Sequence, residues 1–546
     1  MEEGNRKQFS IIKPILLKWL KILAIFLLAM GVFLRFSNLD LHPYWYDETY
    51  TSLQISGYGD TEIREQVDGK ITSVEDLQKY QYPSQDKSTL DTVRLIAEKE
   101  PQLTPLYFVL VRFWTQLFGH SIAAIRSFSA VCGVFCIMAA YWLCIELFES
   151  RTVAWIAISM IAISPFHLLY AQEARPYALW ASTVLLSHIA MLRAMRLQTP
   201  ASWVLYTLSG VLSLYAYLFS LLVLLGHGCY LLIKEKFHIT KAVVNFSLAF
   251  GISIISFVPW LLIFLPNIGK ANLGSSATIL SAPFTYLTAW VRTLGLLFAD
   301  FSLGMGSPKA FLVPYLGILF LVAVLASYAI YSLIRASSKK NWLFIVTAIA
   351  VPLMPLMLKD LISGGGSSTI GRYLIPSLLG IQIAVAHLFA KQFELLQVSP
   401  TLWRKSYKGI FAAVLLVGSL SCLMMVKSEL WWNKAEANLD RQLAAQIINK
   451  AAKPLLVSDA YFAFALSLSH SLDPKARFLL SPENTAPQLP DDLGKETFLY
   501  RPSQKTLSGL RKQYTLTPIK LQNVYNPGSG AEQKGETVRL WEVIKK

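Results

Sequence analysis

Charged residues are scarce in this chain. Asp, Glu, Lys and Arg make up only 15% of its 546 residues, whereas hydrophobic residues make up 54% and the mean hydropathy is +0.44. This composition argues against a set of water-soluble domains and is typical of a membrane protein. The net charge of +16 does not indicate a nucleic-acid partner, because the basic residues are scattered between apolar stretches instead of lining one polar face.

Cysteine is also rare. All five cysteines lie inside apolar runs, without the paired spacing of a zinc site or a disulfide framework, and we interpret them as packing residues. No small-residue cleavage site follows the first apolar run, about 22–36, although five basic residues precede or begin it: Arg6, Lys7, Lys13, Lys18 and Lys21. The run therefore predicts an uncleaved first span.

Long apolar runs of about 20 residues, the length that crosses a bilayer, recur along the chain. They predict a polytopic α-helical membrane protein with about eleven transmembrane helices, within a range of eleven to thirteen. The expected spans are 19–36, 122–147, 153–170, 176–195, 203–217, 219–233, 243–266, 311–334, 342–358, 373–390 and 409–427. Two shorter apolar stretches, 104–119 and 284–299, suit helices lying in the membrane interface.

The basic residues predict the orientation of these spans. With the N-terminus in the cytoplasm, the short inner segments carry far more Lys and Arg than the short outer ones. Two polar segments then lie outside: the acidic loop 37–104, expected to form juxtamembrane helices, and the C-terminal tail. The tail alternates helix-like runs (435–450, 461–471) with strand-like ones (454–457, 477–480, 498–501, 538–543), which predicts a small soluble α/β domain. We expect a transmembrane domain over 1–430, including loop 37–104, and an extracytoplasmic domain over 431–546.

The segment PYWYDETY at 43–50 follows the first span and holds the first candidate for chemistry. Asp47 and Glu48 are adjacent carboxylates at a membrane surface, where one carboxylate tuned as a general base is an attractive interpretation. The neighbouring Tyr46 is a candidate platform for substrate. An interfacial aromatic belt followed by an Asp that caps a helix explains the same residues.

Two more clusters fall on the predicted outer face. SPFHLLYAQEARPYAL at 164–179 brings together Glu173, Arg175 and Tyr177 at a helix start, and a guanidinium there suits a phosphate. GRYLIP at 371–376 places Arg372 and Tyr373 after the glycine-rich stretch 364–368, a loop able to close over substrate. Snorkelling, or a pair with Glu173, is the alternative explanation of Arg175, and an interfacial anchor is that of Arg372. The charge pattern alone put all three clusters on one face, which favours a common site.

These motifs, with QLTPLYFVLVRFWTQLFG and IRSFSAVCG after the acidic loop, resemble the bacterial GT-C membrane glycosyltransferases of family 39, which include protein O-mannosyltransferases and aminoarabinose transferases. The resemblance covers roughly residues 20–430 and implies a GT-C fold. It implies that Asp47 is the catalytic carboxylate, Glu48 its partner, and Arg175 and Arg372 the donor phosphate ligands. The family commonly has His or Lys with consecutive prolines before the PLY segment, whereas this chain reads Gln102-Leu103-Thr104-Pro105.

The resemblance implies transfer of a sugar from a polyprenyl-phosphate donor to a lipid, protein or glycan acceptor, at the outer face of the plasma (inner) membrane. Membrane lipid is the other expected partner. The sequence holds no Gly-rich nucleotide-binding fingerprint on a strand-to-helix turn and no metal-ligand spacing, so it indicates no cofactor, although a divalent metal stays open. The main alternative is a polytopic transporter or lipid flippase, and a scaffold that presents the tail to partners is a second. Transporters place ionisable groups near the membrane midplane and often contain inverted repeats, whereas these charges gather at one face.

Overall fold

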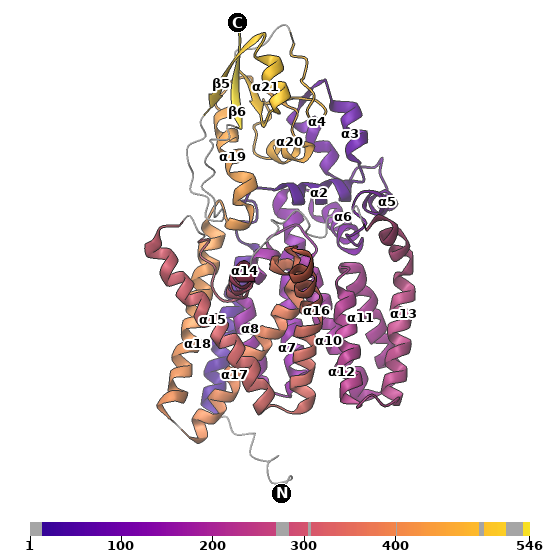
Figure 1. Ribbon diagram of the computed structural model, residues 1–546, viewed down its shortest axis with the longest axis vertical. Helices are drawn as coiled ribbons and strands as arrows, with labels where there is room; N and C mark the ends of the chain where they lie inside the picture. Colours follow the sequence, from indigo (N-terminus) through magenta and orange to yellow (C-terminus); the bar gives the residue numbers. More distant parts are fainter. Residues whose placement is uncertain (1–13, 269–282, 304–306, 400, 491–495, 520–538) are drawn as a thin grey trace.

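Most of the chain is helical in the computed structural model, which describes residues 14–268, 283–303, 307–399, 401–490, 496–519 and 539–546. Arg6, Lys7 and Lys13 of the predicted inner segment lie outside this part. Long helices form a bundle at one end, and a sheet with short helices forms the other, with α2 to α6 between them (Figure 1). The predicted combination of a polytopic α-helical protein and a small α/β region is confirmed.

Each predicted span corresponds to a helix or a bent pair of helices. The helices of the bundle are α1 (Pro14–Phe36), α7 (Ile122–Phe148), α8 (Arg151–Ala162), α9 (Pro165–Ala171), α10 (Tyr177–Leu197), α11 (Pro200–Ala216), α12 (Ser220–Lys234), α13 (Lys241–Phe264), α15 (Lys309–Ala336), α16 (Lys339–Ser363), α17 (Ile375–Val398) and α18 (Leu402–Lys427). Eight described helices are long and apolar enough to cross a membrane, and α8 with α9, bent by 61°, makes a ninth. With 17 and 15 residues, α11 and α12 fall short of that length.

The bend between α8 and α9 follows from Pro165. Proline has no N–H to offer the carbonyl of Ile161, four residues earlier, so the helix breaks there. Arg35, the completely buried penultimate residue of α1, donates instead to the carbonyls of Ala162 (2.7 Å) and Ile161 (3.1 Å). A broken helix is tolerated inside a membrane when other groups satisfy its freed carbonyls, and Arg35 has that role here.

Short elements cover one end of the bundle. They are α2 (Tyr46–Ser56), α3 (Asp60–Val67), α4 (Val74–Gln78), η1 (Lys79–Gln81), α5 (Thr89–Lys99), α6 (Leu106–Phe118), η2 (Leu265–Asn267), α14 (Pro283–Gly295), η3 (Ser367–Thr369) and η4 (Gly371–Leu374). Helices α6 and α14 are the two stretches predicted to lie in the interface. Within α6, Arg112 is buried and donates to the carbonyls of Ile55 and Ser56, which fastens α6 beneath the end of α2.

The C-terminal segment forms most of a six-stranded sheet in the order β1-β3-β2-β4-β6-β5. Its elements are α19 (Trp432–Ile448), β2 (Leu455–Ser458), α20 (Phe462–Ser469), β3 (Arg477–Leu480), β4 (Thr497–Tyr500), α21 (Gln504–Leu510), β5 (Tyr514–Ile519) and β6 (Leu540–Lys545). Strand β2 lies parallel to β3 and β4, while the remaining pairs are antiparallel. Four strands and two helices match the predicted ones within a few residues, although residue 538 lies outside the described part. Strand β5 was not predicted.

The first outer loop and the C-terminal segment share this sheet. Strand β1 (Ile71–Ser73) comes from the loop and pairs antiparallel with β3. One apolar core joins the two segments, since Ile63, Leu77 and Tyr80 pack with Leu456 and Phe478. The two polar segments that the sequence separates by nearly the whole bundle therefore form one body above it (Figure 1).

Candidate active site

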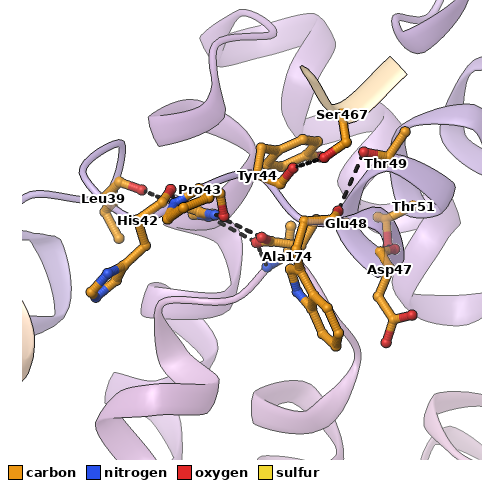
Figure 2. Close-up of polar contacts among 12 residues, drawn as sticks. Leu39, His42, Pro43, Tyr44, Asp47, Glu48, Thr49, Thr51, Ala174 and Ser467 are labelled. Atoms are coloured by element: carbon orange, nitrogen blue, oxygen red, sulfur yellow. Dashed lines mark hydrogen bonds and ion pairs between the residues drawn. The ribbon is translucent and has the colours of Figure 1, made fainter. Parts of the chain in front are cut away.

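The candidate site is organised around the start of α2. Trp45 precedes the helix, and Asp47 and Glu48 lie in its first turn, where the helix dipole favours negative charge. Consecutive helical residues point about 100° apart around the axis. Figure 2 shows the result: the carboxylate of Glu48 turns toward Ala174, and that of Asp47 points away from it. The two adjacent acids therefore enter different environments.

Glu48 enters the protein interior. Its carboxylate forms a two-pronged ion pair with Arg126 of α7: Nε donates to Oε1 (2.8 Å) and Nη2 donates to Oε2 (2.6 Å). The backbone N–H of Ala174 also donates to Oε1 (2.8 Å). Both side chains of the pair are 0% exposed. These contacts anchor the start of α2 to the bundle, and the role of Glu48 as the partner of a catalytic Asp47 stays a prediction.

Arg126 extends the same anchor to the chain before α2. Its Nη1 donates to the carbonyls of Leu39 (2.6 Å) and His42 (2.9 Å), and its Nη2 donates to that of Pro43 (2.9 Å). The guanidinium also lies 5.6 Å from the centre of the Tyr44 ring. One buried cation thus holds the last turn of the connection and the first turn of the helix against the bundle (Figure 2).

The C-terminal segment braces this connection from the other side. Arg441 of α19 is buried and donates to the carbonyl of Tyr44 (2.6 Å). Ser467 of α20 donates to the same carbonyl and is labelled beside Tyr44 in Figure 2. The described contacts give the C-terminal segment a role in positioning the start of α2, which the sequence left open.

Asp47 faces two arginines. Its Oδ2 lies 3.7 Å from Nη1 of Arg372 in η4, with side-chain exposures of 18% and 27%, so the pair is loose and partly open. Nη1 of Arg175 donates to the backbone carbonyl of Asp47 (3.0 Å) and to the hydroxyl of Thr51 (3.2 Å). Three segments far apart in sequence therefore bring one carboxylate and two guanidinium groups together.

Both arginines keep a donor available. Among the described residues, Nε of Arg175 and Nε of Arg372 are buried and have no hydrogen-bond partner. A buried N–H without an acceptor costs about 1–3 kcal/mol, so such a group favours the binding of an acceptor. Nε of Arg35, Arg112 and Arg441 is buried without a partner too, so this feature supports a ligand only together with the position of Arg175 and Arg372 beside Asp47. The charge of the two guanidinium groups favours an anionic acceptor. The Arg372 guanidinium also lies over the rings of Tyr177 (5.7 Å) and Tyr373 (5.6 Å), which fix its direction.

The loop before Arg372 is fastened by hydrogen bonds. Gly364 ends α16 in the left-handed conformation (φ 73°), which glycine adopts without strain. Ser368 donates its N–H to the Asp360 carboxylate and accepts from Nε1 of Trp290 in α14 (3.0 Å), and Lys359 donates to Ser367 (3.0 Å). Hydrogen bonds therefore hold this stretch near Arg372 in the described structure, and its closing over substrate stays a prediction.

The remaining predicted substrate residues surround this group. Tyr177 is buried and Tyr373 is half-buried, and Tyr46 is half-buried with its ring 6.1 Å from that of Phe464 in α20. Burial, and then the charge of Asp47, raise the pKa of Tyr46 to about 12. Glu173 is only 1% exposed, and its backbone carbonyl accepts the N–H of Arg175 (2.7 Å); its role in substrate binding stays a prediction.

Sequence reasoning missed Glu100 at the end of α5. Gln54 of α2 donates to its carboxylate, and burial, reinforced by the nearby charge of Asp47, raises its pKa although Arg175 opposes the shift. Glu100 lies two residues before Gln102, the first residue of the stretch that departs from the family pattern. Arg126 was missed as a site residue too, although an arginine inside an apolar span was a usable signal.

A metal centre is not evident. In the part of the chain that the structure describes, no three His, Cys, Asp or Glu side chains lie close enough together to hold a metal ion. The positive charge beside Asp47 comes from Arg175 and Arg372.

Comparison with known proteins finds one family match, inside the membrane region. Residues 99–263 match the family model described as dolichyl-phosphate-mannose-protein mannosyltransferase. This match supports the resemblance to GT-C membrane glycosyltransferases, and with it the predicted class of activity, glycosyl transfer. No curated protein matches the chain.

Solved structures offer a more distant likeness. ArnT from Cupriavidus metallidurans bound to undecaprenyl phosphate aligns with a TM-score of 0.45 at 13% identity, over 81% of this chain and 88% of that one. AglB, an oligosaccharyltransferase from Archaeoglobus fulgidus in complex with an inhibitory peptide and a dolichol-phosphate, aligns with a TM-score of 0.44 at 13% identity, over 84% of this chain and 64% of that one.

Proposed function

We propose that this membrane glycosyltransferase takes its sugar from a polyprenyl-phosphate donor and transfers it to an acceptor at the outer face of the membrane. The observation that carries the proposal is the meeting of the Asp47 carboxylate with Arg175 and Arg372, each of which keeps a buried N–H available. The description of the matching family, which names a lipid-phosphate sugar, supports the same class of donor.

The two arginines suit the donor phosphate. Guanidinium groups present several N–H donors in a plane and bind phosphate oxygens at more than one point. Arg372 is held only loosely by Asp47, at 3.7 Å, so it can turn toward a phosphate without losing a strong bond. Arg175 is held by its contacts with the backbone of Asp47 and with Thr51, which leaves its Nε to the ligand.

Asp47 suits the acceptor. In the reaction, the acceptor oxygen or nitrogen forms a bond to the anomeric carbon of the sugar, and the bond from that carbon to the phosphate oxygen breaks. The electron pair of the broken bond leaves with polyprenyl phosphate, and the acceptor proton passes to the Asp47 carboxylate. Arg175 and Arg372 stabilise the charge that grows on the departing phosphate.

The other predicted residues then take supporting roles. Glu48, predicted as the catalytic partner of Asp47, acts as a positioning residue through its buried pair with Arg126. Tyr177 and Tyr373 orient Arg372, and Tyr46 forms the wall between Asp47 and the C-terminal segment. We assign Glu173 to the loop that carries Arg175 and not to direct substrate contact.

The orientation follows from charge. We propose a plasma (inner) membrane protein with a cytoplasmic N-terminus. The loops that join α12 to α13, α15 to α16 and α17 to α18 lie at the end away from the sheet (Figure 1), and they belong to the segments rich in Lys and Arg. The site and the C-terminal domain, residues 431–546, are then extracytoplasmic.

A transporter or flippase is the alternative. Such a protein needs its ionisable groups along a path through the bilayer, near the midplane. Here Asp47, Arg175 and Arg372 sit where the bundle meets the outer elements, at the ends of helices, and this location favours an enzyme that works at the surface.

The decisive experiment measures sugar transfer in reconstituted vesicles from a panel of radiolabelled polyprenyl-phosphate sugars. Asp47→Asn is expected to reduce transfer by about 10²–10⁴-fold, the usual contribution of a general base, and Arg372→Ala by about 10²–10³-fold. Asp86→Asn and Arg94→Ala change the same charges at exposed positions of the first outer loop and serve as matched controls. If no donor is consumed, or if Asp47→Asn remains fully active, the proposal is wrong and the transporter becomes the leading explanation.

A further inference from the structure

An apolar groove lies at the end of the bundle farthest from Asp47. It has a volume of about 480 Å³ and runs between α1 and α18, with Phe393 of α17 also lining it. Leu20, Leu27 and Phe411 are buried and form its floor, whereas Trp19 on its rim is 65% exposed. The volume is within the range of pockets that hold small molecules, about 300–1,000 Å³. The groove's lining residues belong to the candidate membrane spans α1, α17 and α18, so a lipid chain suits it.

Charge marks one end of this groove. Lys408 is the only charged residue among those lining it in the described part of the chain. Helices α1 and α18 run in the same direction, and Lys408 and Trp19 both lie within two turns of their starts. Tryptophan is enriched at the depth of lipid headgroups, so Lys408 is placed at headgroup level while the apolar walls continue toward the membrane centre.

The surroundings of Lys408 select the sign of the headgroup. Neither α1 nor α18 contains an Asp or Glu, and the one acid of α17 is Glu394, next to the lining residue Phe393. Near their starts, α1 and α18 carry several basic residues besides Lys408: Lys18, Lys21, Arg404 and Lys405. Basic pockets between membrane helices bind anionic lipid headgroups in this way.

We infer that this groove binds one acyl chain of an anionic phospholipid from the leaflet opposite the candidate active site, with the phosphate of its headgroup beside Lys408. The bound chain fills the space between α1 and α18. These two helices lead directly into the loop before Asp47 and into the C-terminal segment, so the lipid stabilises the pair of helices on which the outer body rests. The inference does not depend on the sugar donor.

The test is native mass spectrometry of the full chain in detergent. The protein is mixed with phosphatidylglycerol, phosphatidylcholine or undecaprenyl phosphate, one at a time, and the lipid that stays bound after the detergent is removed is measured. Phosphatidylglycerol is expected to be retained more strongly than phosphatidylcholine, and Lys408→Gln to weaken its retention about fivefold, the contribution of one lysine near a lipid surface. Ala412→Trp fills the groove and is expected to abolish specific retention.

Matched controls lie on the same helix. Lys427→Gln, in the last turn of α18, and Ala413→Trp make the same changes at exposed positions that do not line the groove, and both should bind phosphatidylglycerol as the unmodified protein does. Equal retention of the two phospholipids, or an undiminished signal from Lys408→Gln and Ala412→Trp, would overturn the inference. Preferential retention of undecaprenyl phosphate that Ala412→Trp removes would overturn it as well, by assigning the groove to the donor lipid.

Discussion

Exchanging Glu48 for Gln separates the roles of the two adjacent carboxylates. The substitution keeps the size of the side chain but removes one of two opposite charges that are both 0% exposed. Arg126 then remains buried with three backbone carbonyls and no anionic partner. We expect the protein to lose stability while keeping its chemistry, because Asp47 and its arginines are not touched.

The size of the effect follows from the contacts. Removing one partner of a buried ion pair costs about 3–5 kcal/mol of unfolding free energy. Arg126→Gln is expected to cost at least as much as Glu48→Gln. It also removes the donor of the backbone carbonyls that accept from the guanidinium, and each carbonyl left unsatisfied costs about 1–3 kcal/mol. Asp47→Asn disturbs only a loose, partly exposed pair, which is worth about 0–1 kcal/mol.

Heat unfolding of the purified protein in detergent, followed by tryptophan fluorescence, gives the ranking. Arg126→Gln should have the lowest unfolding midpoint and Glu48→Gln the next lowest. Asp47→Asn should unfold at the same temperature as the unmodified protein. Transfer is measured well below these midpoints, where Glu48→Gln should remain far more active than Asp47→Asn. The reasoning is refuted if Glu48→Gln unfolds normally and loses transfer as completely as Asp47→Asn, since Glu48 would then take part in the reaction.

Three further substitutions test other contacts. Arg35→Met should lower the unfolding midpoint, because it leaves the Ala162 carbonyl without its donor at about 1–3 kcal/mol, whereas the Ile161 carbonyl still accepts from the N–H of Ser164; an unchanged midpoint contradicts that role. Glu100→Gln should raise the midpoint more at about pH 8 than at about pH 4, because a carboxyl pKa raised by folding weakens the fold above that pKa; equal shifts at both pH values count against the raised pKa. Tyr46→Phe should leave the shape of the transfer–pH profile unchanged up to about pH 10, because the pKa of Tyr46 is raised to about 12, and a shifted alkaline limb would show that its phenol titrates earlier.

Much of the membrane region could be predicted because its signal is local. Runs of about 20 apolar residues predict spans wherever they occur, and each expected span corresponds to a helix or a bent pair of helices. The break at Pro165 was not predicted, although a proline is a signal for one. The flanking residues stay apolar, and the break is tolerated because Arg35, in another helix, donates to the carbonyls there. Strand β1 also escaped prediction, since three residues carry no period and depend on a partner at the far end of the chain.

The site could be predicted in part. Loop charges placed the segments of Asp47, Arg175 and Arg372 on one face, and the structure brings these three residues together. The different environments of the Asp47 and Glu48 side chains could not be predicted, because they depend on where α2 begins and on which side chains surround its first turn. Arg126 lies 78 positions from Glu48, and pairing at that separation is decided by helix packing and not by sequence spacing.

The shared sheet has a consequence for biosynthesis. Strand β1 leaves the ribosome early, whereas its partner β3 lies about 400 residues later, and β6, which pairs with β4 and the edge strand β5, follows later still. At roughly 5–20 residues per second, β1 waits on the order of 20–80 s for its neighbour. Arg441 and Ser467, which brace the connection before Asp47, arrive equally late. A nascent chain, or one truncated before Arg441, thus holds Asp47 without this brace, so assembly of the first turn of α2 waits until residues 441–467 have been made.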